Sequence, residues 1–193
     1  MLFRSRISKI YHNNGNGTFT DINANLIGVH DSSVAWGDYE NDGNLDILLK
    51  GLTVSSDGIS KIYHNNGNGT FTDININLPA VEESSVAWGN YDNDCDLDIL
   101  LTGTTISMVI SKIYRNNGNG TFTDILANLM PVHHSSVAWG DYDNDGDLDI
   151  LLMGRVGGFG VGSISKVYRN DGNNTFTNIN ANLIGVHDGS VAW

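Results

Sequence analysis

Short apolar stretches, each interrupted by turn-forming residues, recur along the whole chain. In one unit they lie at Ser136–Gly140, Leu148–Met153, Ser165–Arg169 and Thr175–Ile179. The second stretch is almost continuously apolar, as expected of a strand that is buried on both faces. The Asn-Gly-Asn-Gly segment at residues 117–120 is typical of a hairpin turn. Because no segment has sustained helical periodicity, the pattern predicts an all-β protein built from short strands.

This pattern repeats, and one tryptophan and one tyrosine mark each unit. The marker residues are Trp36, Trp88, Trp139 and Trp193, and Tyr11, Tyr63, Tyr114 and Tyr168. Both series have spacings of 52, 51 and 54 residues. We expect a single repeat array over residues 1–193, with units of about 1–33, 34–85, 86–136 and 137–190. Four strands per unit of this length predict a β-propeller of four-stranded antiparallel blades, about four per chain.

The two ends of the chain have complementary patterns. The first unit starts with the third stretch, at residues 8–12, whereas the chain ends on a first stretch at residues 190–193. We expect residues 190–193 to complete the N-terminal blade, with Met1–Phe3 as a stub of its second strand. The ring would close in cis or in a homodimer with an eight-blade ring, and we favour the dimer because two-fold symmetry is the commonest. A fragment of a larger ring is the third interpretation.

The chain is acidic, with a formal net charge of −12. Thirteen of its 22 acidic residues lie in three nine-residue segments, at residues 38–46, 90–98 and 141–149. An acidic chain lacks the cationic surface that nucleic acid requires, so no nucleic acid partner is expected. A single cysteine, Cys95, excludes a disulfide within the chain. No hydrophobic stretch is long enough to span a membrane, so no membrane insertion is expected.

The three acidic segments carry the most specific pattern in the chain. Each follows Val-Ala-Trp-Gly and runs into Leu-Asp-Ile-Leu-Leu, so each joins two predicted strands. The third segment has a carboxylate at every odd position and a glycine at the sixth. Calcium prefers six to eight oxygen ligands, and glycine permits the positive φ of a tight loop. The spacing therefore predicts calcium loops, with up to three ions per chain.

Positions 1, 3, 5 and 9 of each loop would offer side chains, and position 7 its backbone carbonyl. The candidate ligands are Asp38, Glu40, Asp42, Asn44 and Asp46; Asn90, Asp92, Asp94, Asp96 and Asp98; and Asp141, Asp143, Asp145, Asp147 and Asp149. An EF-hand is excluded, because its glutamate at position 12 is replaced by Leu49, Leu101 and Leu152. The competing interpretation is a solvated acidic turn, but so many adjacent carboxylates repel one another without a cation.

The three loops differ in how closely their residues match the calcium-binding pattern. The first has the longer Glu40 at position 3, and the second has neutral Asn90 at position 1 and Cys95 in place of the glycine. We expect the second site to be the weakest, and calcium to have a structural role. Loops of modest affinity suit the millimolar calcium outside cells, so we expect an extracellular or secreted protein, although no signal segment is visible.

The repeat unit resembles a known family. Residues 137–152, Val-Ala-Trp-Gly-Asp-Tyr-Asp-Asn-Asp-Gly-Asp-Leu-Asp-Ile-Leu-Leu, followed by Tyr-Arg-Asn-Asp-Gly at 168–172 and Thr175-Phe176, resemble the FG-GAP/VCBS repeats of integrin-alpha-like propellers. The resemblance covers all four units. It implies a β-propeller with calcium between the first and second strands of a blade, and a role in cell adhesion, in sugar binding or as a non-catalytic part of secreted enzymes. The family ring usually has seven blades.

Strand alternation places the connections between strands on two faces of the predicted ring. The acidic loops and the third-to-fourth hairpins share one face, and their sequences are nearly identical between units. The second-to-third connections, at residues 51–58, 103–109 and 154–162, share the other face and differ from one another. Such variation on a constant frame is where a binding surface is expected, although drift in loops is an equal alternative.

Polar pairs in the fourth-to-first connections lie on the same face as the variable loops. They are His30-Asp31, Glu82-Glu83, His133-His134 and His187-Asp188. They are candidates for sugar hydroxyls or a second metal, against the simpler interpretation of solvated loop residues. No catalytic constellation is expected, because adjacent His and Asp residues do not make a triad. The marker tryptophans are expected to pack between blades rather than to stack on sugars.

Two function hypotheses follow. The first is a non-catalytic, calcium-stabilised propeller that acts as an interaction or scaffold module for a protein ligand. The second is a multivalent lectin with equivalent, individually weak carbohydrate sites. An accessory domain of a secreted enzyme is a weaker third. Equivalent pockets would favour the lectin, whereas a protein binder would use the variable loops.

Overall fold

A computed structural model describes residues 6–157 and 162–193 of the chain. These residues form three four-stranded antiparallel sheets and a separate two-stranded sheet. The strands of the two-stranded sheet are β1 (Tyr11–Asn13) and β2 (Phe19–Asp21). The first large sheet contains β3 (His30–Gly37), β4 (Asp46–Leu52), β5 (Gly58–Asn65) and β6 (Phe71–Asp73). The second contains β7 (Val86–Gly89), β8 (Asp98–Thr104), β9 (Val109–Asn116) and β10 (Phe122–Asp124). The third contains β11 (His133–Gly140), β12 (Asp149–Arg155), β13 (Ser163–Asn170) and β14 (Phe176–Asn178).

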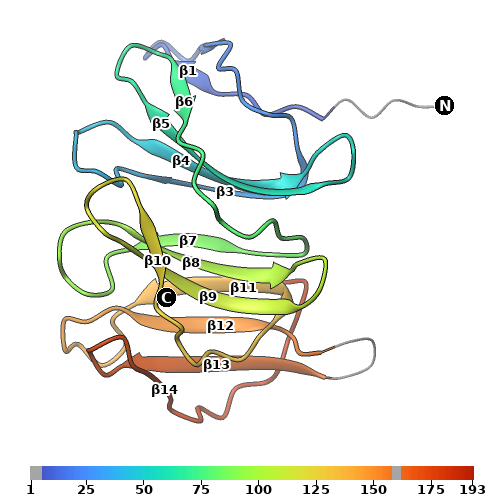
Figure 1. The fold of residues 1–193 in the computed structure, drawn as a ribbon, viewed down its shortest axis with the longest axis vertical. Helices are drawn as coiled ribbons and strands as arrows, with labels where there is room; N and C mark the ends of the chain where they lie inside the picture. The colour runs from blue at the N-terminus through green and yellow to red at the C-terminus, as the bar shows by residue number, and fades with distance from the viewer. Residues whose placement is uncertain (1–5, 158–161) are drawn as a thin grey trace.

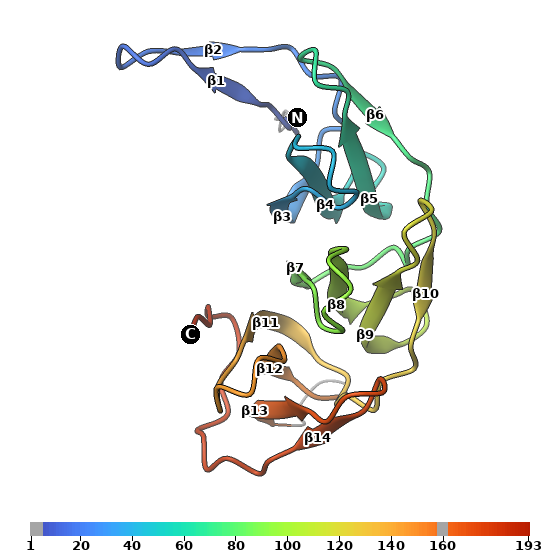
Figure 2. The same ribbon diagram turned by 90° about the vertical axis from the view of Figure 1, so that its left-hand side faces the viewer.

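The large sheets have the topology and arrangement of propeller blades. Within each sheet the spatial order of the strands follows the chain. The three blades succeed one another along an arc, with β3, β7 and β11 on its concave side and β6, β10 and β14 on its convex side (Figure 2). Figure 1 shows the same blades stacked along the long axis of the molecule. The predictions of an all-β fold and of four-stranded antiparallel blades are therefore confirmed.

The described part of the chain does not show closure of the predicted ring. Strands β1 and β2 pair only with each other, and residues 190–193, predicted as a first strand, are not in a strand. The predicted stub at Met1–Phe3 lies outside the described residues. The array is open, with β1 and β2 at one end and the C-terminal segment beside β11 at the other (Figure 2).

Strand boundaries differ from the sequence pattern by a few residues. The strand expected at residues 136–140 begins at His133, because a bulge between His133 and Ser136 lets pairing with β12 continue to Arg155. The same irregularity lies between His30 and Ser33 in β3. Thus His30-Asp31 and His133-His134, expected in connections, belong to the first strands. Glu82-Glu83 and His187-Asp188 remain outside the strands.

The core forms within and between the blades. The second strand of each blade is the most buried, as its apolar run predicts: Ile47 and Leu48 are 1% and 0% exposed, and Ile99 and Leu100 are both 0% exposed. Fully burying a side chain of this size stabilises the fold by about 1.5–3 kcal/mol. None of the described residues forms a helix that could cross a membrane.

Candidate metal loops and the opposite face

The acidic loops connect β3 to β4, β7 to β8 and β11 to β12. In the third loop the Asp141 carboxylate accepts hydrogen bonds from the backbone N–H groups of Asp145 (3.1 Å) and Gly146 (3.0 Å). Gly146 has a φ of +93°, as the predicted tight turn requires. Carboxylate oxygens of Asp141, Asp143 and Asp149 all lie within 4.8 Å of one another, so this loop could hold a metal ion.

The aspartate at position 9 is a buried anchor in every loop. Asp46, Asp98 and Asp149 are each 0% exposed. Asp98, for example, accepts hydrogen bonds from the N–H groups of Tyr91 (3.1 Å) and Asn116 (2.8 Å), which ties the loop to strand β9. Burial raises the pKa of all three carboxyl groups, and that of Asp98 to about 7, although these backbone hydrogen bonds oppose the shift. A bound cation would favour the charged form and reverse the effect.

A residue that sequence reasoning missed lies beside the first loop. Asp38 accepts from the N–H groups of Asp42 (3.0 Å) and Gly43 (2.9 Å), as Asp141 does in the third loop. The missed residue is His64 of β5, whose Nδ1 lies 2.5 Å from Glu40 Oε1. Glu40, Asp42 and His64 form a possible metal-binding group. The equivalent residue in the other blades is arginine, so only a comparison between repeats could have singled out this histidine.

The second loop is organised differently. Its first residue, Asn90, has a buried Oδ1 with no hydrogen-bond partner. Cys95 replaces the glycine and has a φ of +80°, so the predicted backbone conformation is confirmed although the residue is unfavourable there. Within the described residues this loop holds no group of three acidic, histidine or cysteine side chains close enough to bind a metal. A buried acceptor without a partner nevertheless fits a cation ligand, because such an atom is otherwise costly.

Neighbouring loops also contact one another. The Asn93 amide donates to Asp147 Oδ1 at 2.7 Å, and the Asn41 amide donates to Asp96 Oδ1 at 3.0 Å. The side chain at position 7, for which only a backbone role was expected, therefore links two of the loops to the preceding blade. The role of its carbonyl as a ligand stays a prediction, as do the remaining ligand assignments.

The marker tryptophans pack between blades, as expected. Trp88 stacks on Tyr39 of the preceding blade (centroids 6.1 Å apart, planes at 9°), and Trp139 stacks on Tyr91 in the same way (6.2 Å, 12°). Trp193 lies on Tyr142 at 6.5 Å. Trp36 differs, because it contacts Phe71 of its own blade and remains 48% exposed.

The opposite face carries the variable connections and the polar pairs. Val54 in the first connection is 73% exposed, and Met108 in the second is 59% exposed beside the fully exposed Ile106. Part of the third connection, residues 158–161, lies outside the described residues. Among the polar pairs, Glu83, His133 and His134 converge into one group.

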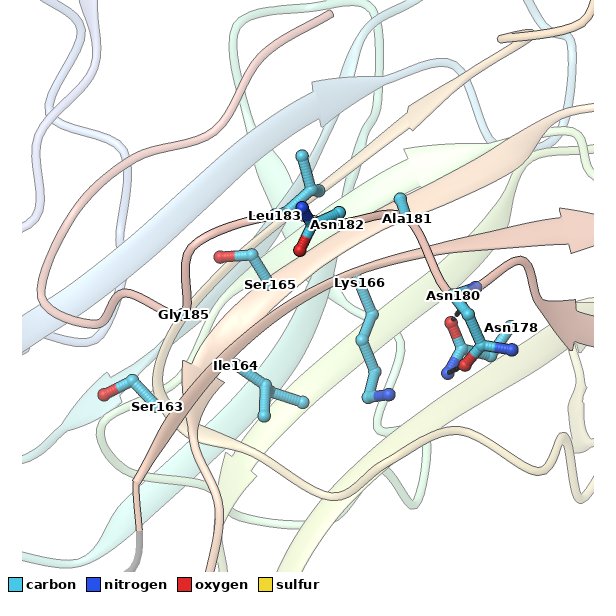
Figure 3. Close-up of a pocket in the computed structure, with 10 residues that line it drawn as sticks. All are labelled: Ser163, Ile164, Ser165, Lys166, Asn178, Asn180, Ala181, Asn182, Leu183 and Gly185. Atoms are coloured by element: carbon cyan, nitrogen blue, oxygen red, sulfur yellow. Dashed lines mark hydrogen bonds between the residues drawn. The ribbon is translucent and has the colours of Figure 1, made fainter.

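A polar hollow of about 300 Å³ lies beside β13 and the segment that follows β14 (Figure 3). Its lining includes Ser165, Lys166 and Asn180. The equivalent hollow in the N-terminal unit, about 280 Å³, is lined by the matching residues Ser8, Lys9 and Asn23. Sequence reasoning did not single out either hollow, because their polar residues look like ordinary turn residues.

A serine, a histidine and an aspartate meet at the edge of this face without the geometry of a catalytic triad. Ser163 Oγ lies 2.6 Å from His187 Nδ1. His187 Nε2 lies 3.5 Å from the carboxylate of the adjacent Asp188, beyond the range of a good N–H···O hydrogen bond. The arrangement therefore lacks the oriented base that nucleophilic catalysis needs.

Comparison with known proteins agrees with the geometry of the blades. A family model described as FG-GAP-like repeat matches residues 4–49, 52–101 and 107–152. Each matched segment contains one acidic loop, the strand before it and the first part of the strand after it. No curated protein and no solved structure matches the chain.

Proposed function

Because the chain belongs to the FG-GAP-like repeat family, whose members are typically ligand-binding propeller modules and usually non-catalytic, we propose that it is a calcium-stabilised, non-catalytic interaction module for an extracellular protein ligand. The observation that carries the proposal is the difference between the two faces. One face holds three acidic loops of nearly constant sequence. The other presents exposed apolar side chains on connections that differ from blade to blade.

Calcium is the ion that best suits the face with the three acidic loops. The donors there are almost all carboxylate or amide oxygens, which a hard cation prefers. Three calcium ions would halve the net charge of −12. Their role in the proposal is to hold each acidic loop closed and so to keep the first two strands of each blade in register.

Removal of calcium tests this role. A chelator should lower the melting temperature, because an ion bound only to the folded state stabilises it by about 2.7 kcal/mol per site at one hundred times its Kd. The Asp143→Asn variant should show a smaller response to calcium than the native chain, with Asn119→Asp, outside the acidic loops, as a control. An unchanged melting temperature on chelation would remove calcium from the proposal.

The ligand face is tested with loop variants. A triple variant, with serine in place of Val54, Ile106 and Met108, removes the exposed apolar side chains without touching the metal loops. Secreted proteins that the native chain captures in millimolar calcium should no longer be captured by this variant. A Leu126→Ser variant, changed at an exposed position outside the variable connections and outside the proposed dimer contact, should still capture them. Equal capture by both variants would contradict a binding surface on the variable connections.

A lectin is the second candidate, and one observation favours it. The matched polar hollows at Lys9 and Lys166 are the kind of equivalent site that a multivalent sugar binder needs. A glycan array, probed in millimolar calcium and again with chelator, separates the candidates. Calcium-dependent binding to one sugar class that is lost in Asn180→Ala and Asn23→Ala would establish the lectin. No binding by the folded protein would leave the protein ligand.

We also propose that the two ends of the array join those of a second copy. Between the blades, Trp88 lies against Gly37 and Trp139 lies against Gly89. At one end of the array, Trp193 lies against Gly140 in the same way, so it occupies the position that the tryptophan of a next blade would have. At the other end, Trp36 has an exposed face and no blade before it. A homodimer that places Val191–Trp193 of one copy beside the β1–β2 sheet of the other would cover both ends and form an eight-blade ring.

A further inference from the structure

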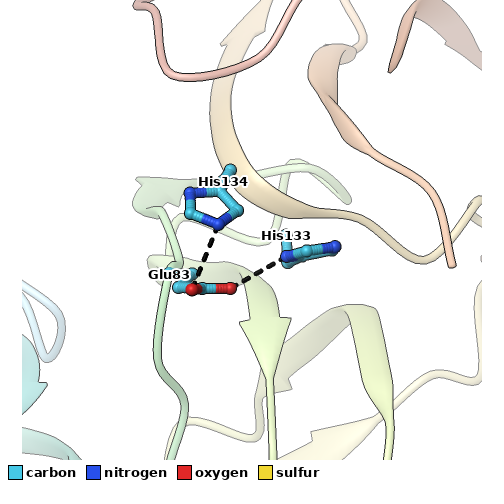
Figure 4. A group of neighbouring side chains, drawn as sticks. All are labelled: Glu83, His133 and His134. Atoms are coloured by element: carbon cyan, nitrogen blue, oxygen red, sulfur yellow. Dashed lines mark hydrogen bonds and ion pairs between the residues drawn. The ribbon is translucent and has the colours of Figure 1, made fainter. Parts of the chain in front are cut away.

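Three side chains from two blades meet on the face opposite the acidic loops. Glu83 precedes β7, whereas His133 and His134 begin β11 (Figure 4). His133 Nδ1 lies 2.9 Å from Glu83 Oε2, and His134 Nε2 lies 3.1 Å from Glu83 Oε1. One ligand atom from each of the three side chains falls within 4.8 Å of the others. The glutamate thus lies between two imidazole nitrogens.

The outer nitrogen of each imidazole faces an oxygen as well. His133 Nε2 lies 3.1 Å from the carbonyl oxygen of Gly157, and His134 Nδ1 lies 2.8 Å from Asp188 Oδ1. A carbonyl and a carboxylate can only accept hydrogen bonds, so each ring has an acceptor at both of its nitrogens. A neutral imidazole has a single N–H, so one nitrogen of each ring points a lone pair at an acceptor. When the outer nitrogens carry the protons, both inner lone pairs point at the Glu83 carboxylate.

Each lone pair is repelled by the negatively charged carboxylate unless a positive charge lies between them. Two further protons, one on each ring, would supply this positive charge. A metal ion would supply it too, and would use the same three groups as ligands. Outer hydrogen bonds to a carbonyl or a carboxylate are what ligating histidines commonly have, because these bonds hold the ring orientation and tautomer.

We propose that His133, His134 and Glu83 bind a divalent transition metal of the zinc class. Two imidazole nitrogens and one carboxylate are a common zinc donor set, whereas calcium takes oxygen ligands. In a tetrahedral site with bonds of about 2.1 Å, neighbouring ligand atoms are about 3.4 Å apart. This is slightly more than the 2.9 and 3.1 Å of the two contacts that Glu83 makes. The half-exposed Glu83 side chain can supply this small shift.

The site joins successive repeats and remains open to solvent. Glu83, His134 and Asp188 occupy the same position in three consecutive units, and the metal would link the second blade to the third through the first two of them. Asp188 orients His134 from the segment that follows the third blade. Three protein ligands leave the fourth coordination position for water or for a donor group of a bound partner.

The first unit supplies a matched control within the same chain. His30 and Asp31 occupy the positions of His133 and His134, but the Arg6 guanidinium lies 3.5 Å from His30 Nε2. A fixed positive charge at that distance disfavours a metal cation. The His30→Asn variant should therefore leave zinc binding unchanged.

The test is a zinc titration of the full chain by calorimetry, in millimolar calcium so that the acidic loops are occupied. Cobalt substitution provides a second readout, because its visible absorption reports nitrogen ligands and tetrahedral geometry. We expect one zinc site of this kind per chain. Glu83→Gln and His134→Asn should weaken it by at least about 100-fold, and Asp188→Asn by about 10–100-fold because it acts through His134. Far-ultraviolet circular dichroism of each variant would verify the fold.

The outcomes separate a metal site from a protonated ion-pair cluster. Zinc binding that is lost in Glu83→Gln and His134→Asn, but kept in His30→Asn, would establish the site. The absence of zinc binding to the native chain would overturn the proposal and leave the cluster as a set of hydrogen-bonded side chains. Zinc binding of equal strength in native chain and Glu83→Gln would also overturn it, because the ion would then lie elsewhere.

Discussion

At the residue scale, the repeats place the same backbone conformation at each equivalent position, while the side chain found there varies. Position 6 of the acidic loops has a φ of +86° at Gly43, +80° at Cys95 and +93° at Gly146. Position 4 is also left-handed, and each loop has asparagine there, a residue that tolerates this region. Cys95 is thus the one loop residue whose side chain conflicts with the conformation that its neighbours impose.

Replacement of Cys95 by glycine should stabilise the protein. A non-glycine residue in the left-handed region costs about 1 kcal/mol, so Cys95→Gly should raise the free energy of unfolding by about that amount in a denaturant titration. It should also strengthen calcium binding by the second loop, because the loop reaches its bound conformation more readily. The reverse change, Gly146→Cys, should lower both quantities. A Cys95→Gly variant less stable than the native chain would contradict this account.

A second conflict at this scale is a charged residue in a buried strand. Lys50 in β4 is 3% exposed, whereas the equivalent residues Thr102 and Met153 are uncharged and fully buried. Burial lowers the pKa of Lys50 to about 8, although Asp31 opposes the shift. Its ammonium group donates a hydrogen bond to the Asp31 carbonyl at 2.9 Å, which only partly replaces lost hydration.

The Lys50→Met variant should be more stable than the native chain at pH 7, by about 1–3 kcal/mol. Between the folded pKa of about 8 and the ordinary lysine pKa of 10.5, the unfolded chain binds the proton more strongly than the folded chain. Native stability should therefore rise through this pH range, and the advantage of the variant should shrink. Melting curves from pH 7 to 11 would measure the difference. A constant difference across this range would show that Lys50 does not titrate as proposed.

At the element scale, blades adhere through an aromatic contact that needs a glycine beneath it. A Cβ atom placed on Gly89 would lie 2.5 Å from Trp139, and one on Gly37 would lie 2.7 Å from Trp88. The tyrosine of each acidic loop covers the other part of the same tryptophan. Asn116 and Asn170 add buried hydrogen bonds to backbone carbonyls of the preceding blade. The metal loop and the blade interface are thus parts of one structural unit.

The Gly89→Ala variant should separate the second and third blades. Overpacking of this kind costs about 1–3 kcal/mol, and we expect a loss of stability in that range together with a change in tryptophan fluorescence. Gly58→Ala is the matched control, because its Cβ would have an ordinary contact of 3.4 Å with Ala80. Equal effects of the two substitutions would show that the Gly89–Trp139 contact does not hold the blades.

At the scale of the whole molecule, stability should follow from nearest-neighbour blade contacts, as in other repeat arrays. Within the described residues, the β1–β2 sheet is then a weak part of the array, since it pairs with no other strand. Ile7, Tyr11 and Phe19 in the N-terminal unit are 56–64% exposed. An array with such exposed apolar residues at one end gains from a partner that covers them.

The proposed dimer should have twice the chain mass of 20.9 kDa in light scattering. Trp36→Ser should shift the equilibrium toward the monomer, because it removes an apolar face that the joined ends would bury. Val54→Ser, on the variable face, should leave the mass unchanged. A native chain that stays monomeric at high concentration would contradict closure between two copies.

How far the sequence predicts the structure depends on the range of the contacts. The blades, the hairpins and the acidic loops follow from local patterns of apolar residues, glycines and asparagines. The order of these elements along the chain can therefore be predicted without knowing which distant residues are in contact. The strand ends were predicted less well. The bulge that extends β11 back to His133 depends on pairing with Arg155, which no short window of sequence contains.

By itself, the sequence determined the all-β architecture, the four-strand unit and the three acidic loops, because each rests on interactions between residues close in the chain. Only the tertiary structure decided what lies between units: the burial of Asp98, the entry of His64 into the first loop and the meeting of Glu83 with His134. Glu83 and His134 are about fifty positions apart, so the sequence could mark both polar pairs as candidates without showing that they meet. Packing of one blade on the next brings them together, and that packing depends on the geometry of whole sheets.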